Sequence, residues 1–110
     1  MLERVEHGAR ILLGESAAEN DRLVRWALAE ARDATWVHLD AFPSGHALVL
    51  DGAPPAAVAA AARLCLERSK HRALRDAKAA ATPASNLVLT ATLGEVEFVS
   101  RRRVRRFTIA

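Results

Sequence analysis

The sequence has little cysteine, few aromatic residues and no long apolar run. A single cysteine, Cys65, excludes an intrachain disulfide and gives no reason to expect an oxidising compartment. No stretch approaches the ~18 apolar residues that a membrane-spanning helix requires, and the charged N-terminus lacks the apolar region of a signal peptide. We therefore expect a soluble, cytoplasmic protein without a membrane partner. Tyrosine is absent and only two tryptophans and three phenylalanines occur, so a large base-stacking surface is not expected either.

What the sequence does contain is typical of one globular domain. Hydrophobic residues make up 51% and charged residues 26% of the 110 positions, which predicts a single domain over residues 1–110. Charge is unevenly divided: residues 1–62 carry five arginines and nine acids (−4), and residues 63–110 carry eleven lysines or arginines and four acids (+7). Such asymmetry indicates either a face that binds a polyanion or a solvated, arginine-rich surface.

The hydrophobic pattern predicts an α+β fold with two main helices and a largely antiparallel sheet. Two strands, 36–40 and 46–50, flank a central turn, and alternation along a strand places Trp36, His38 and Asp40 on one face. A first hairpin covers residues 5–13, and the helices are expected after Ser16 and over about 55–76. Residues 78–82 are predicted as an edge strand because Pro83 interrupts them. Residues 95–100 and 104–109 are predicted as a closing hairpin joined by three arginines.

The central turn gathers the only dense polar group, which consists of His38, Asp40, Ser44 and His46. A His-x-Asp pair on a strand with a nearby histidine has the ligand types of a metal site, but the spacing is short and generic. The alternative is that His38 and Asp40 only make hydrogen bonds within the hairpin. Cys65 is predicted on the apolar face of a helix, and no nucleophile elbow or glycine-rich phosphate loop is present. We expect no metal, no cofactor and no catalytic residue.

Two basic clusters favour the binding of a polyanion. Ser69, Lys70 and Arg72 lie near the predicted end of the second helix, where cations also complement the helix dipole. The second cluster consists of Arg101, Arg102, Arg103, Arg105 and Arg106, and the last two are expected on opposite faces of a strand. Arginine binds phosphate bidentately. Four contacts with the phosphates of a single strand would lower affinity about 50-fold between 50 and 200 mM salt.

Five motifs occur in an order that resembles the NFACT-R domain, the RNA-binding domain of the NFACT proteins of ribosome-associated quality control. They are Gly14 with Asn20-Asp21, Trp36-Val37-His38-x-Asp40, Pro43-Ser44-Gly45-His46, Ser69-Lys70-His71-Arg72, and Thr82-Pro83-Ala84-Ser85-Asn86-Leu87 followed by Gly94-Glu95-Val96 and Phe98. The basic C-terminal segment resembles most the short stand-alone branch, which includes eukaryotic coiled-coil-containing homologues. The resemblance implies an α+β domain that binds structured RNA. It does not imply peptide tailing, because the tRNA-recognition region, helical arms and coiled coil of larger members are missing from these residues.

The leading hypothesis is therefore a stand-alone RNA-binding module that acts on tRNA or ribosomal RNA. Its expected contact residues are His38, Asp40, Ser44, His46, Ser69, Lys70, Arg72, Arg101, Arg102 and Arg103. In this interpretation the histidines, with an ordinary pKa near ~6.5, gain charge beside a bound anion. DNA and the ribosome are further possible partners, and the oligomeric state is open. Two other classes remain: an enzyme acting on nucleic acid or nucleotides through His38, Asp40 and His46, and a protein-interaction module that docks on the ribosome.

Overall fold

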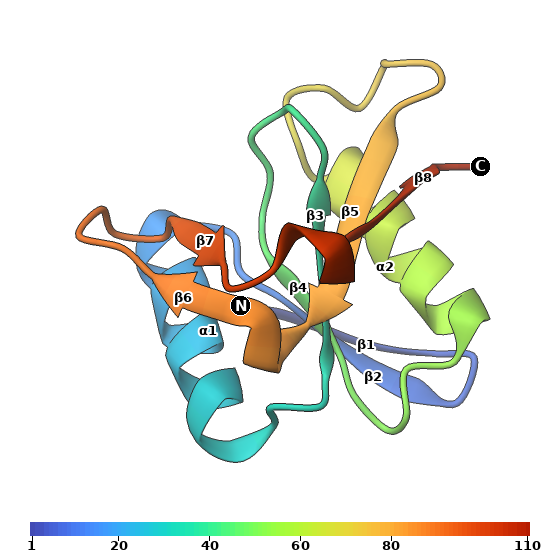
Figure 1. Ribbon diagram of the computed structural model, residues 1–110. Coiled ribbons are helices and arrows are strands. Elements are labelled where there is room, and N and C mark those ends of the chain that lie inside the picture. The colour runs from blue at the N-terminus through green and yellow to red at the C-terminus, as the bar shows by residue number, and fades with distance from the viewer.

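The computed structural model describes all 110 residues and is built on one six-stranded antiparallel sheet (Figure 1). The spatial order of its strands is β1-β2-β4-β3-β5-β8, and β6 and β7 form a separate two-stranded sheet. The predicted α+β class, with two main helices and a largely antiparallel sheet, is confirmed. The elements are β1 Leu2–Glu6, β2 Ala9–Leu13, α1 Ala17–Glu30, β3 Thr35–Leu39, β4 Ala47–Val49, α2 Pro55–Glu67, β5 Lys78–Pro83, the 3₁₀ turn η1 Ala84–Asn86, β6 Leu87–Leu89, β7 Val96–Phe98, the 3₁₀ turn η2 Arg101–Arg103, and β8 Arg105–Thr108.

The large sheet is covered on both faces, by a different layer on each (Figure 1). On one face, Val37 and Ala81 belong to a core cluster that includes Ala61 and Cys65 of α2. On the other face, Trp36 and Leu48 pack with residues of α1 and of the β6–β7 sheet. Consecutive residues of β3 therefore enter different cores, as the alternation of side chains along a strand requires. The small residues of α2 allow that helix to lie close to the sheet. Neither helix has the length and apolar character needed to cross a bilayer.

The predicted central hairpin is confirmed. Strands β3 and β4 pair antiparallel, with Thr35 opposite Val49 and Val37 opposite Ala47. The predicted first hairpin is also confirmed as β1 and β2, with Glu6 opposite Ala9.

The second helix ends earlier than predicted, at Glu67 instead of near Asp76. The hydroxyl of Ser69 donates to the carbonyl of Leu66 (2.8 Å) and accepts the His71 amide (3.0 Å). A serine side chain that bonds to nearby backbone offers an alternative to helical hydrogen bonds. Lys70 and Arg72 consequently lie in a loop, and Asp76 ends that loop with a φ of 55°, in the left-handed region.

Strand β5 is interior, so the prediction of an edge strand is wrong. It pairs with β3 on one side and with β8 on the other. Pro83 is tolerated because it is the last residue of β5 and lies beyond the Lys78–Ala81 stretch that β8 pairs with.

The predicted closing hairpin is also wrong, because its two strands belong to different sheets. Strand β7 pairs with β6, strand β8 pairs with β5, and η2 connects them. The buried side chain of Asn86 accepts the Ser100 amide (2.8 Å) and donates to the Ser100 carbonyl (2.8 Å) and to Thr82 Oγ1 (3.0 Å). The Thr82 hydroxyl in turn donates to the Arg103 carbonyl (3.0 Å). These bonds hold the segment between β7 and β8 against the end of β5.

Candidate functional site

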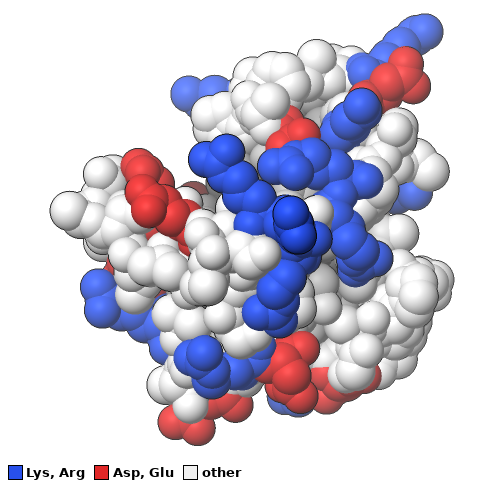
Figure 2. Space-filling view, viewed as in Figure 1, with Lys and Arg blue, Asp and Glu red and all other residues white.

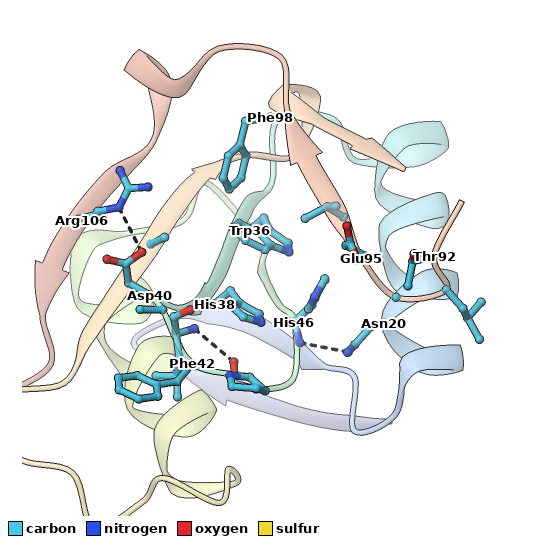
Figure 3. Close-up of a pocket in the computed structure, with 18 residues that line it drawn as sticks. Asn20, Trp36, His38, Asp40, Phe42, His46, Thr92, Glu95, Phe98 and Arg106 are labelled. Atoms are coloured by element: carbon cyan, nitrogen blue, oxygen red, sulfur yellow. Dashed lines mark hydrogen bonds and ion pairs between the residues drawn. The ribbon is translucent and has the colours of Figure 1, made fainter. Parts of the chain in front are cut away.

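A pocket of about 640 Å³ opens on the face of the sheet that carries α1 and the β6–β7 sheet (Figure 3). Three residues that are paired across neighbouring strands form part of its lining. His38 of β3 lies opposite Ala80 of β5, and Ala80 lies opposite Arg106 of β8. The connection between β6 and β7 supplies Thr92 to Glu95, and the turn after β3 supplies Phe42 to Ser44. Four segments that are far apart in the sequence therefore meet at one cavity.

Aromatic and imidazole rings line the inner part of this pocket. The rings of Trp36 and His38 are parallel with centroids 5.6 Å apart, and the His46 ring is perpendicular to both, at 5.4 and 4.9 Å. Phe98 of β7 contacts Trp36 edge to face at 5.6 Å. The prediction that His38 and His46 converge beside the central turn is confirmed by this packing.

Burial keeps both imidazoles uncharged. Desolvation lowers the pKa of His38, and it lowers the pKa of His46 to about 3, with a smaller contribution from repulsion by His38. At neutral pH the pair is therefore neutral, and the expectation of histidines that gain charge easily is wrong for this environment. His46 cannot serve as a general base near pH 7, since an effective base has a pKa close to the working pH.

Two polar atoms of this cluster have no partner within the chain. The indole Nε1 of Trp36 and the Nδ1 of His46 are buried and make no hydrogen bond. The two residues are 3% and 4% exposed. Buried polar atoms without a partner are uncommon in native proteins, and each costs about 1–3 kcal/mol.

The carboxylate of Asp40 is engaged at the mouth of the pocket. Arg106 Nε donates to Asp40 Oδ1 at 3.1 Å (Figure 3). Ser44 is also occupied, because its hydroxyl accepts the Leu39 amide (3.2 Å) and donates to the Gly45 carbonyl (2.9 Å). Asp40 is thus paired with a cation, and Ser44 closes the turn.

The loop after α2 borders a second cavity of about 360 Å³. Ser69 and Lys70 line it together with Ser44 and the first residues of α1, whereas Arg72 is exposed and lines neither cavity. The rings of Phe42 and His71, 4.8 Å apart, connect the loop to the rim of the first pocket. The structure therefore brings Ser44, Ser69 and Lys70 together, as expected, and leaves Arg72 at the periphery.

The C-terminal arginines form an exposed ridge over η2 and β8. We call Arg101, Arg102, Arg103, Arg105 and Arg106 the arginine ridge. All five are exposed, and Figure 2 shows blue side chains gathered along this part of the surface. Only Arg106 forms an ion pair with an acid. Arg105 and Arg106 lie opposite consecutive residues of β5 and so point to different faces, as predicted.

The metal and enzyme alternatives find little support in this geometry. No three histidine, cysteine, aspartate or glutamate side chains are placed to hold a metal ion. His38 and His46 are close, but Asp40 is bound to Arg106. Burial of the Cys65 thiol raises its pKa to about 12, which removes it as a nucleophile.

The expected contact residues did not include three residues that shape the site: Asn20, Phe98 and Arg106. Asn20 is buried, and its Oδ1 accepts the His46 amide at 3.0 Å. This contact requires glycines, because a Cβ on Gly14 would lie 2.3 Å from Asn20 Oδ1 and a Cβ on Gly45 would lie 2.1 Å from the Gly14 carbonyl oxygen. The one available signal for Asn20 was the spacing of Gly14, Asn20 and Gly45 within the resemblance.

Comparison with known proteins agrees with this architecture. In the Streptococcus suis fibronectin/fibrinogen-binding protein, the C-terminal part has a similar fold, with a TM-score of 0.82 and 20% identity. The match covers 97% of this chain and 43% of that one, so the chain spans less than half of its neighbour. No curated protein matches the chain. The family model of the NFACT protein RNA-binding domain matches residues 4–99. The chain therefore belongs to the NFACT RNA-binding domain family.

Proposed function

We propose that this domain binds structured RNA, either tRNA or ribosomal RNA, through phosphate contacts along the arginine ridge. The observation that carries the proposal is that the ridge places five arginines within six residues, all exposed, and only one of them is paired with an acid. Guanidinium groups bind phosphate bidentately, and RNA helices are recognised mainly by shape and backbone contacts. A role in translation quality control agrees with the family.

The ridge is a property of this chain beyond the segment that defines the family. The family match ends at residue 99, two residues before Arg101. Family membership and the ridge are thus independent arguments for an RNA partner.

The loop after α2 is proposed as a second contact area. Lys70 and Arg72 are exposed and form no ion pair, and Lys70 lies beside Ser44 at the second cavity. Of the residues expected from the sequence, Lys70, Arg72, Arg101, Arg102 and Arg103 are proposed as phosphate contacts. Ser69 and Ser44 are proposed to position the backbone, and His38, Asp40 and His46 to line the pocket.

The test is the salt dependence of RNA affinity. A tRNA transcript and a ribosomal RNA hairpin are titrated with the protein between 50 and 200 mM salt, with a DNA duplex of equal length as competitor. The triple variant Arg101→Gln, Arg102→Gln, Arg105→Gln should weaken binding and reduce the slope of log K against log salt by about 2, at ~0.7 per lost contact. Replacing Lys70 and Arg72 with alanine should also weaken binding and flatten the slope.

A matched control removes equal charge elsewhere. Arg4, Arg22 and Arg63 are exposed and unpaired, and they lie on β1, α1 and α2. Changing these three to glutamine should leave the slope almost unchanged. Equal losses of RNA affinity and of salt slope in both triple variants would refute the arginine ridge as the contact surface.

A further inference from the structure

The pocket beside the arginine ridge is chemically unlike a phosphate site. Trp36, His38, His46 and Phe98 line its inner part, and both imidazoles are uncharged at neutral pH because burial lowers their pKa. A phosphate would meet aromatic surface there with no cation in the interior. The arginine that lines the pocket, Arg106, stands at its mouth and is bound to Asp40. The interior therefore favours an uncharged molecule.

The two unpartnered atoms indicate what kind of uncharged molecule the pocket can bind. Trp36 Nε1 only donates a hydrogen bond, and a neutral imidazole offers one donor and one acceptor. Both Trp36 and His46 are more than nine-tenths buried, and both line the pocket. A ligand that satisfies them needs a hydrogen-bonding edge, and one that fits among rings needs a flat aromatic body. A nucleobase has both properties.

Two close contacts shape the walls of the pocket. Gly94 has a φ of +77°, and a Cβ at this position would lie 2.9 Å from the backbone of Ala17, so the 92–95 segment is pressed against the start of α1. On another side, Asn20 holds the backbone of His46. A volume of about 640 Å³ lies within the range of small-ligand pockets.

We propose that this pocket receives one unpaired nucleobase of the bound RNA, hydrogen-bonded to Trp36 and His46, while its phosphate lies at Arg106 and the arginine ridge. Proteins commonly read single-stranded RNA in this way, with bases splayed out and held by aromatic or imidazole rings. The inference rests on the proposed RNA-binding function, which supplies the strand. It adds selectivity for RNA with an unpaired base.

The test uses the unmodified protein and the indole N–H signals of its two tryptophans. Trp26, on α1, is 41% exposed and does not line the pocket, so it is an internal control, and the Trp26→Phe variant assigns the signals. The probes are a hairpin RNA with one bulged nucleotide and the same hairpin with an abasic site at that position. We expect the Trp36 signal to shift saturably with the bulged hairpin only, and the position of the Trp26 signal to remain unchanged. The abasic hairpin should bind about 10-fold more weakly than the bulged hairpin.

A variant separates the hydrogen bond from the packing. Trp36→Phe keeps an aromatic ring and removes the N–H donor. It should reduce the preference for the bulged over the abasic hairpin while the salt slope remains. If this variant does not fold, the titration of the unmodified protein still decides the matter.

The results of these titrations distinguish base binding in the pocket from RNA binding along the arginine ridge. If both hairpins bind equally with the expected salt slope, the pocket assignment is refuted and RNA binding by the ridge stands. If neither RNA binds, the four nucleoside 5′-monophosphates are titrated instead. A saturable shift of the Trp36 signal then supports the nucleobase pocket with free nucleotide as its source, and refutes the RNA function. No shift with any of the four refutes the pocket.

Discussion

The hydrogen bonds of Asn86 should determine both the stability of the domain and the position of the arginine ridge. Asn86 is fully buried and makes three side-chain hydrogen bonds, two to the backbone of Ser100 and one to Thr82. At about 1 kcal/mol for each bond, Asn86→Ala should lower the free energy of unfolding by about 3 kcal/mol. This is a large part of the ~5–15 kcal/mol that holds a typical domain folded.

Urea denaturation followed by circular dichroism measures this change. With a slope of about 1.5 kcal/mol per molar urea, the midpoint should fall by about 2 M. Thr90→Ala is the control, because its hydroxyl bonds only within an exposed loop, and it should change stability by less than about 0.5 kcal/mol. Because Ser100 directly precedes Arg101, the folded fraction of Asn86→Ala should also bind RNA more weakly.

A small effect would refute the reasoning. The free energy of unfolding of Asn86→Ala could fall by less than about 1 kcal/mol while its dependence on urea concentration stays unchanged. In that case the three hydrogen bonds would not hold the β7–β8 connection in place. The backbone bond from the Val99 amide to the Asn86 carbonyl (2.9 Å) persists in the variant, so any loss reports on the side chain.

Three further predictions concern the hairpin and the acid stability of the domain. Gly45→Ala should cost about 2 kcal/mol or more, measured by thermal melting, because its Cβ would lie 2.1 Å from the Gly14 carbonyl oxygen; a loss below ~1 kcal/mol contradicts the close approach. His46 takes up a proton near pH 6.5 when unfolded but only near pH 3 when folded, so stability should fall as pH drops through this window. In the His46→Gln variant, the urea midpoint should decrease less between pH 7 and pH 4 than in the unmodified protein. An equal decrease in both proteins would argue against a buried neutral imidazole. The pKa of Asp51, lowered to about 2 by Arg10, implies that their pair stabilises above pH 4 and is lost as pH falls toward 2. Asp51→Asn should remove that part of the acid transition, and an identical acid transition would show that the pair contributes nothing.

Local patterns predicted the elements whose partners are near in sequence. The central hairpin has alternating residues on both sides of a turn, so its pairing and the shared face of Trp36 and His38 followed from periodicity. The start of α2 at Pro55 followed from proline chemistry and alanine propensity. These preferences act within a few residues.

The wrong predictions of helix length and strand pairing depended on partners that are distant in sequence or on side chains that replace backbone hydrogen bonds. The early end of α2 depends on the Ser69 hydroxyl, which competes with the helix. The separation of β7 from β8 depends on Asn86, which lies 14 residues from Ser100. The interior position of β5 depends on β8, whose residues are more than twenty positions away along the chain.

The sequence by itself determined the fold class, the family resemblance, the position of the histidine turn and the positive charge of the C-terminal half. Those properties are set by composition, by periodicity and by short motifs. Only the tertiary structure decided that both histidines are neutral, that Asp40 is paired with Arg106, and that Trp36, His46 and Phe98 enclose a pocket next to the arginine ridge. Burial and long-range pairing set pKa values and cavities, and both arise when β3, β5, β7 and β8 assemble.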